Sequence, residues 1–294
     1  MGDFGVAERK IRNLMSEGTV FKYQGDTYKI LKSDKPTCPK GEPKTDIYIL
    51  AENEKGAKIE IKISYKKENA DFIENKMSAE RAGQLFGPLW KEVIEESTTA
   101  IQQRFAERML IYRNKYKRTS KGAITLGWKF ELMNKISGEL SGRMLLTEEQ
   151  VIDVYAGGNL SEEKKNACVC GEIVPDSGVA NYILMDESVE TAQEVVDKML
   201  PIEEYVRKHP DIYFACKALN YRSFEQKWDG DRPLSVQVDW NAFDGKLVPE
   251  LVYDKPLLVK GNEMAERLVA YMKELQIRNT DDIDEDNAGT DRIV

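Results

Sequence analysis

Two acidic side chains and one lysine have the spacing of a metal-dependent hydrolytic site. Asp46 opens the apolar run Ile47-Tyr48-Ile49-Leu50, and Glu60 and Lys62 lie in the next run, Ile59-Glu60-Ile61-Lys62-Ile63-Ser64. Alternation along a strand sends the isoleucines to one face, which we expect to be core, and Glu60 and Lys62 to the other. If the two strands pair through the turn between them, Asp46 lies near Glu60, and two carboxylates converge with one ammonium.

This set of groups suits hydrolysis of a phosphodiester bond. Mg²⁺, with Mn²⁺ as its expected substitute, prefers hard oxygen ligands and usually takes only one or two carboxylates, which Asp46 and Glu60 would supply. Lys62 would orient the attacking water and balance charge in the transition state. The alternative is a strand face exposed to solvent, on which the three residues form a salt bridge of little consequence.

A family resemblance extends this interpretation. The arrangement Pro43-Lys44-Thr45-Asp46, a hairpin and then Glu60-Ile61-Lys62 resembles the signature of the PD-(D/E)XK nuclease superfamily, which includes many type II restriction endonucleases. It covers about residues 1–90, and it departs from the strict form because two residues separate the proline from Asp46. The resemblance implies an additional acidic residue on the first helix, for which Glu8 is the candidate; the alternative for Glu8 is a solvated helix position.

Elimination narrows the chemistry further. His209 is the only histidine. This argues against enzyme classes that need histidine as a base or metal ligand, namely ββα-metal nucleases, histidine-dependent phosphodiesterases, zinc peptidases and Ser-His-Asp hydrolases. The chain has no G-x-x-x-x-G-K-[ST] phosphate loop, so we expect no nucleotide cofactor. Cys168-Val-Cys170 lacks the spacing of a zinc pair, and ordinary thiols are the preferred interpretation.

The elements that position the site follow from periodicity and turn signals. These patterns predict an α/β fold. The resemblance implies that its core is restriction-endonuclease-like, a mixed central β-sheet flanked by helices, and we expect a C-terminal recognition lobe beside it. The expected helices lie at residues 6–15, within 70–111, at 190–208 and at 263–275, and the expected strands at 20–23, 27–31, 47–50, 58–64, 234–239 and 247–253, with a further amphipathic run at 124–136. The predicted division is a nuclease core at 1–145, a recognition lobe at 146–280 and a disordered acidic tail at 281–294.

Charge is distributed unevenly, which allows DNA binding despite a net charge of −8. Residues 1–150 carry 27 Lys and Arg against 22 Asp and Glu, whereas residues 151–294 carry 16 against 29. Basic and polar side chains that can contact phosphates or base edges fall in three segments. The candidates are Lys66, Lys67 and Asn69; Arg113, Lys115, Lys117, Arg118 and Lys121; and Arg222 and Gln226. A solvated helix start, a charged surface and a structured loop are the respective alternatives.

Together these patterns predict a Mg²⁺-dependent type II restriction endonuclease that cuts double-stranded DNA. Because one such site cuts one strand, we expect a homodimer. The alternatives are another nuclease of the same superfamily, for repair, recombination or junction resolution, and a non-catalytic DNA-binding protein. No apolar run of membrane-spanning length and no export or lipid signal is present, so we expect a cytoplasmic protein without membrane contact.

Overall fold

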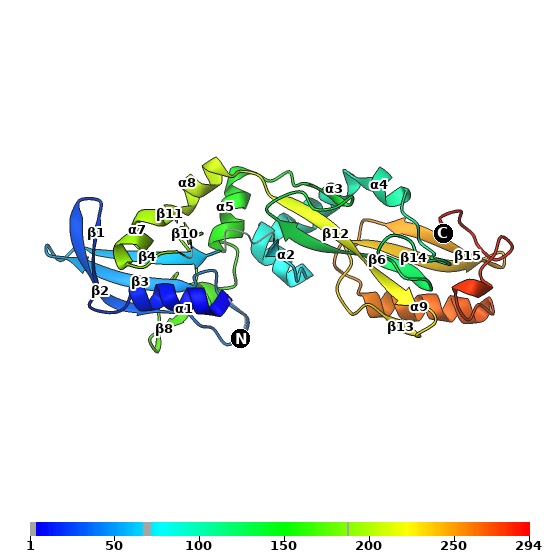
Figure 1. Ribbon diagram of the computed structural model, residues 1–294, viewed down its shortest axis with the longest axis horizontal. Coiled ribbons are helices and arrows are strands. Elements are labelled where there is room, and N and C mark those ends of the chain that lie inside the picture. The colour runs from blue at the N-terminus through cyan, green and yellow to red at the C-terminus, as the bar shows by residue number, and fades with distance from the viewer. Residues whose placement is uncertain (1–3, 67–71, 187) are drawn as a thin grey trace. The chain divides into compact units, whose positions relative to one another are not determined.

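The chain forms two compact units, neither of which is continuous in sequence. The computed structural model describes residues 4–66, 72–186 and 188–294 (Figure 1). Unit 1 comprises residues 1–70, 83–87 and 146–210, and unit 2 comprises residues 71–82, 88–145 and 211–294. One passage of the chain between the units lies at the predicted boundary after residue 145, but the units are not the contiguous lobes that the sequence predicts. Sequence order suggested contiguous lobes, but each unit completes its sheet with strands from distant parts of the chain.

Unit 1 is built on a six-stranded mixed sheet. Its strand order is β1-β2-β3-β4-β10-β11, and only the pairing of β10 with β4 is parallel. The predicted strands at 20–31, 47–50 and 58–64 are confirmed. The strand bounds are β1 Val20–Tyr23, β2 Asp26–Asp34, β3 Ile47–Asn53, β4 Lys58–Tyr65, β10 Tyr182–Leu184 and β11 Leu200–Pro201.

Two helices cover one face of this sheet. Helix α1 (Phe4–Leu14) and helix α7 (Ala192–Lys198) pack on the face that carries the isoleucines of β3 and β4 (Figure 1). Ile47, Ile49 and Ile63 are fully buried there, so the predicted alternation is confirmed. The remaining elements of unit 1 are α5 Glu148–Ala156, α6 Glu162–Lys165, α8 Ile202–Lys208, β8 Cys168–Val169 and β9 Glu172–Ile173.

The expected single helix at 190–208 is interrupted. Helix α7 ends at Lys198, and Leu200 and Pro201 form the short edge strand β11 before α8 begins. Proline cannot donate the hydrogen bond that a continuing helix needs, and Pro201 takes the position just before the first residue of α8. The helical prediction was therefore right for both halves and wrong at their junction.

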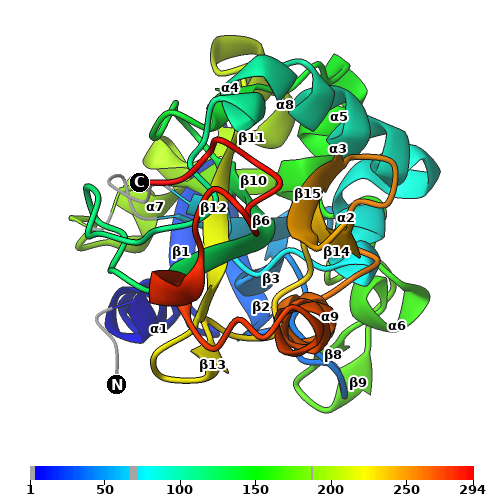
Figure 2. The ribbon, with the colours of Figure 1, turned by 90° about the vertical axis from the view of Figure 1, so that its right-hand side faces the viewer.

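Unit 2 contains a larger sheet with the order β13-β12-β6-β14-β15; β5 pairs with β6, and β7 with β12. The amphipathic run at 124–136 is the central strand β6, which is buried along nearly its whole length. Helix α9 (Gly261–Glu274) lies along the sheet beside β14 (Figure 2). No helix among the described residues has the length and apolar composition to span a membrane. The strands are β5 Phe72–Glu74, β6 Ala123–Met133, β7 Ser141–Arg143, β12 Tyr213–Arg222, β13 Lys227–Trp228, β14 Val236–Phe243 and β15 Lys246–Val252.

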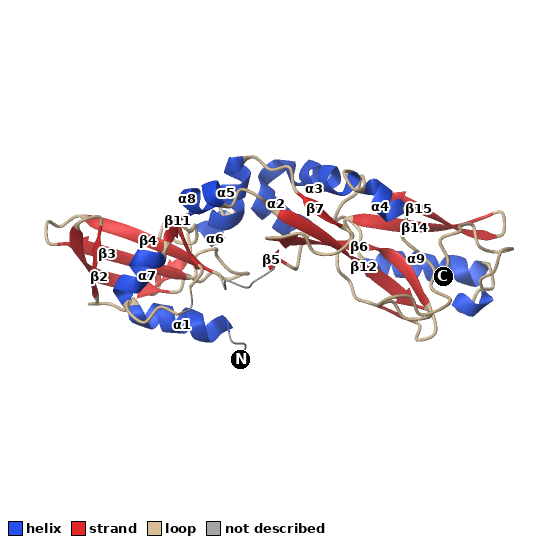
Figure 3. Cartoon of the chain, turned by 45° about the horizontal axis from the view of Figure 1, so that its top comes forward, coloured by secondary structure: helices blue, strands red, loops and turns tan. Residues whose placement is uncertain are grey.

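The helices of the first half of unit 2 fall where the helical pattern at 70–111 predicts them. They are α3 (Trp90–Thr99) and α4 (Gln102–Ala106), and they follow α2 (Ala79–Phe86) and the 3-10 turn Gly87–Leu89 (Figure 3). Strand β5, at the start of that stretch, is a departure from the helical prediction. Phe105 of α4 packs edge-on against Trp128 of β6 and Tyr253, which anchors this helix in the core of unit 2.

Residues 281–294 are paired with the rest of unit 2, in contrast to the predicted disordered tail. The carbonyl of Arg292 accepts hydrogen bonds from the amides of Leu110 and Ile111, at 2.9 and 3.2 Å. The backbone of Val294 bonds to that of Asn114 and Ile111. Acidic composition alone predicted disorder, but backbone pairing does not depend on side-chain polarity.

Candidate functional site

The register of β3 and β4 decides where the predicted trio lies. Ile47 pairs with Ile63, Tyr48 with Lys62 and Leu50 with Glu60. Asp46 directly precedes β3, and its amide donates to the carbonyl of Ile63 at 2.8 Å. Continuing the register by one residue places Asp46 opposite Ser64. Glu60 is four residues away along β4, roughly 13 Å at the usual rise per residue.

Glu60 and Lys62 share a face of β4, as predicted, but they do not converge with Asp46. The hydroxyl of Tyr48 donates to Glu60 Oε1 at 2.5 Å, and burial, together with this bond, raises the pKa of Tyr48 above its ordinary value. Lys62 Nζ donates to the carbonyl of Asp176 at 3.0 Å. These two side chains therefore hold neighbouring segments of unit 1.

Asp46 instead lies at the far end of β4. Its Oδ2 accepts a hydrogen bond from the amide of Tyr65 at 2.8 Å. Burial raises the pKa of Asp46 to about 6, against the opposing effects of the Lys66 ammonium and the Tyr65 amide, and the charge of Glu8 raises it further. A carboxyl group whose pKa is raised by burial, and on which the charges of a lysine and a second carboxylate act, is typical of functional sites.

Helix α1 supplies the second carboxylate of this group. Glu8 forms an ion pair with Lys35 Nζ at 2.9 Å, and its side chain is only 17% exposed. Burial acts to lower the pKa of Lys35, but the bond to Glu8 and the charges of Glu8 and Asp46 outweigh it and raise the pKa. We call Glu8, Lys35, Asp46 and Lys66 the Asp46 cluster.

Two buried hydroxyls lie next to Asp46. Thr45 precedes it in sequence and Ser64 faces it in register, and each residue is 1% exposed. Neither hydroxyl has a hydrogen-bond partner among the residues that the structure describes. Buried polar atoms without protein partners are rare and need another donor or acceptor, such as a ligand oxygen or water.

The Asp46 cluster contains two carboxylates, those of Asp46 and Glu8, and the charge of Glu8 acts on Asp46. Within residues 4–66, 72–186 and 188–294, no group of three or more His, Cys, Asp or Glu side chains is arranged for a metal. Mg²⁺ commonly keeps several waters and takes only one or two carboxylates together with substrate phosphate, so these two carboxylates are the ligands to test for it. Glu60 lies four positions away from Ser64 along β4 and is not part of this cluster.

The expected Glu60-Ile61-Lys62 does not lie beside Asp46. Ser64, Tyr65 and Lys66 lie there instead, four positions further along the chain, so a serine stands where a carboxylate was expected. The turn between β3 and β4 could have shown from the sequence which residue of β4 lies opposite Asp46. Asn53 and Ala57 close this turn with a hydrogen bond of 2.9 Å, and counting outward from its centre pairs Asp46 with Ser64.

The residues predicted to contact DNA are spread over both units. Lys66 belongs to the Asp46 cluster, and Lys67 and Asn69 lie outside the described residues. All of the residues predicted in the second segment are exposed on unit 2: Arg113, Lys115, Lys117, Arg118 and Lys121. Two of them are engaged in ion pairs, Lys117 with Glu139 and Lys121 with Asp281.

The third predicted segment forms the end of the β12–β13 hairpin. Arg222 Nε donates to Asp229 Oδ1 at 2.7 Å across that hairpin, and Asp229 also accepts from Asn220. Gln226 is in the turn and has a left-handed backbone, with φ of +50°. The hairpin contact accounts for the orientation of Arg222 without a nucleic acid.

Comparison with protein-family models, with curated proteins and with solved structures gave no match to this chain.

Proposed function

We propose that this chain is a Mg²⁺-dependent DNA endonuclease of the PD-(D/E)XK type, with the Asp46 cluster as its active site. Mn²⁺ would substitute for Mg²⁺. The observation that carries the proposal is the partly buried carboxylate of Asp46, whose pKa is raised to about 6 and on which the charges of both Glu8 and Lys66 act. The cluster sits at the end of two paired strands, so the backbone fixes its spacing.

Each member of the cluster has a distinct role in this proposal. Asp46 and Glu8 would hold the divalent ion, which when bound lowers the pKa of a water ligand and withdraws charge from the phosphoryl oxygens. Lys66 would orient the attacking water and offset the negative charge that develops on the phosphate. Lys35 neutralises Glu8 at 2.9 Å and would have to release it when the carboxylate becomes a ligand.

The biological role that we propose is restriction of double-stranded DNA. A single site of this type cuts one strand, so a double-strand break would need two copies of the chain acting as a homodimer. The same chemistry would serve a nuclease of repair, recombination or junction resolution, and the two roles differ in substrate.

Two lysines four residues apart, Lys62 in β4 and Lys66 just after its end, give a matched test. Duplex DNA is incubated with Mg²⁺ and with the unaltered protein, Lys66→Met, Lys62→Met or Asp46→Asn. We expect Lys66→Met and Asp46→Asn to lower the cleavage rate by about 100-fold or more, the scale of a lost transition-state contact. Lys62→Met should stay within about threefold, because Lys62 is bonded to the Asp176 carbonyl.

The pattern of products separates the alternatives. Discrete fragments indicate restriction, a smear or a preference for branched DNA indicates another nuclease, and binding without cleavage removes the enzymatic proposal. Equal loss of activity in Lys62→Met and Lys66→Met would contradict the placement of the site.

A further inference from the structure

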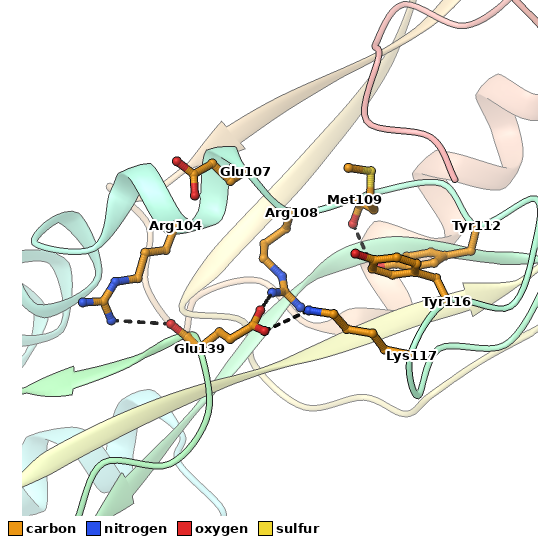
Figure 4. Close-up of a pocket in the computed structure, with 8 residues that line it drawn as sticks. All are labelled: Arg104, Glu107, Arg108, Met109, Tyr112, Tyr116, Lys117 and Glu139. Carbon is orange, nitrogen blue, oxygen red and sulfur yellow. Dashed lines mark hydrogen bonds and ion pairs between the residues drawn. The ribbon is translucent and has the colours of Figure 1, made fainter.

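A cavity in unit 2 combines convergent cations with tyrosine rings. It encloses about 290 Å³, close to the lower end of the range for small-molecule sites. All of its lining comes from the segment between α4 and the β6–β7 loop, and none of it belongs to the Asp46 cluster. The lining residues are Arg104, Glu107, Arg108, Met109, Tyr112, Tyr116, Lys117 and Glu139 (Figure 4).

Two cations of this cavity meet on one carboxylate. Arg108 contacts Glu139 Oε2, and Lys117 Nζ contacts Oε1 at 2.8 Å, so each oxygen of Glu139 has one positive partner (Figure 4). These contacts lower the pKa of Glu139 and raise that of Lys117. Two oxygens bridging an arginine and a lysine reproduce the contacts that two oxygens of a phosphate group would make.

Glu139 is held in a way that permits its replacement. Its side chain is 62% exposed, and it follows Gly138, whose φ is +86°, in the loop between β6 and β7. Ion pairs this exposed contribute little to stability, so an anion of higher charge can displace the carboxylate. Arg104 secures the loop separately, because its guanidinium donates to the Ser141 carbonyl at 2.8 Å.

The walls of the cavity are pre-organised on the side of Lys117. Tyr112 is buried, and its hydroxyl donates to the Met109 carbonyl at 2.9 Å. Tyr116 is 40% exposed and pairs with Thr119 around a turn in which Lys117 has a φ of +52°. Left-handed backbone at a non-glycine residue is strained, and such strain concentrates at binding sites. The exposed Tyr116 ring offers a surface for stacking beside the cations.

We infer that this cavity binds a phosphate ester, which displaces Glu139 from between Arg108 and Lys117 while its nucleoside contacts Tyr116. Glu139 is then a built-in competitor that weakens binding. The chemistry is shared by a DNA backbone phosphate and a free nucleotide, and only the choice of DNA as the expected source rests on the proposed function.

The test compares two exposed lysines of unit 2. Binding of a fluorescent 20-base-pair duplex is measured by anisotropy in EDTA, where cleavage plays no part, for the unaltered chain, Lys117→Ala, Lys273→Ala and Glu139→Gln. Lys273, on α9, is exposed, carries the same charge and does not line the cavity. We expect Lys117→Ala to weaken binding by about tenfold, and Lys273→Ala by less than about threefold. Glu139→Gln should tighten it by about three- to tenfold and steepen the salt dependence by about one phosphate contact.

Tightening by Glu139→Gln is the readout that a purely structural role would not give. A second arm follows thermal unfolding with deoxyadenosine monophosphate. In one outcome the nucleotide stabilises the unaltered chain but not Lys117→Ala, while the two lysine variants bind the duplex equally well. That result supports the phosphate site, with a free nucleotide as its ligand. Equal behaviour of Lys117→Ala and Lys273→Ala with both probes, and no tightening in Glu139→Gln, would overturn the inference. Loss of cleavage at the Asp46 cluster leaves these binding results unaffected, so the two proposals fail separately.

Discussion

The ionised carboxylate of Asp46 is held in the folded protein at the expense of stability. Burial raises its pKa from the ordinary 3.8 to about 6, so between these pH values the folded state binds more protons at this site than the unfolded state does. The contribution of Asp46 to the free energy of unfolding therefore falls as the pH rises from about 4 to about 6. Above that range this contribution no longer changes with pH. This is opposite in sign to a carboxylate in a salt bridge, and it is the behaviour of a group kept for its chemistry.

The first prediction follows from that sign. Asp46→Asn removes the titration but keeps an oxygen that can accept from the Tyr65 amide. The variant should gain stability relative to the unaltered protein as the pH rises from 4 to 7, by a difference on the order of 3 kcal/mol. Urea unfolding at each pH measures it, and other titrating groups cancel in the comparison. A stability difference that does not change with pH would contradict the assigned environment of Asp46.

For individual residues, the sequence predicts which side chains belong to the candidate site better than it predicts which of them lie next to one another. Asp46 and Glu8 were selected from residue type and family resemblance, and both belong to the Asp46 cluster. Glu60 and Lys62 were selected because they share a strand face, which is correct, but alternation cannot tell which end of a face lies opposite Asp46. Lys66 was assigned to DNA contact because it follows the strand, and its closeness to Asp46 depends on register.

Strand β4 is held on one side by a side chain as well as by backbone pairing. Asn181, just before β10, accepts from the Lys62 amide through Oδ1 at 2.7 Å and donates through Nδ2 to the Glu60 carbonyl at 3.0 Å. It thus extends the parallel pairing of β10 with β4 toward the start of β4. The position of β4, and with it that of Lys66, depends partly on this amide.

Asn181→Ala should therefore loosen β4 locally. We expect a loss of about 1 kcal/mol in the free energy of unfolding, because two hydrogen bonds disappear and water can reach the exposed groups. Hydrogen exchange of the Lys62 amide should become at least about fivefold faster. Asn181→Asp serves as the matched variant: it keeps an acceptor for that amide and should protect it better than Ala does. Unchanged exchange in Asn181→Ala would show that Asn181 does not clamp the strand.

Strands and helices were predictable where their pattern was local. The isoleucine alternation located β3 and β4, and the turn residues located the β1–β2 hairpin. Strand β6 was read only as an amphipathic run, because a strand buried on both faces loses the alternation that identifies it. The pairing of β10 with β4 joins residues more than a hundred positions apart, and no local pattern reports such a contact.

On the scale of the whole molecule, the C-terminal segment is part of unit 2. Deleting residues 289–294 removes four backbone hydrogen bonds of Leu110, Ile111 and Asn114. At about 0.5–1.5 kcal/mol each, we expect unit 2 to lose about 2–6 kcal/mol of stability. The four tryptophans, Trp90, Trp128, Trp228 and Trp240, all belong to unit 2, so tryptophan fluorescence during urea unfolding reads this unit selectively. An unchanged unfolding midpoint would restore the prediction of a disordered tail.

The division into units was beyond the reach of the sequence. Composition and charge indicated two parts of roughly the right size, but they place a boundary along the chain and cannot express a chain that passes between units several times. The charge contrast between residues 1–150 and 151–294 reflects sequence halves, each of which contributes to both units.

The parallel pairing of β4 with β10 also sets an order of events on the ribosome. β4 is complete at Tyr65, whereas its neighbour ends at Leu184. At typical elongation rates of 5–20 residues per second, the nascent chain carries β4 as an open sheet edge for about 6 to 24 s before β10 has been made. During that interval the isoleucine-rich strand is open to pairing with other chains. Chaperone demand in this protein should therefore be greatest while its middle third is being translated.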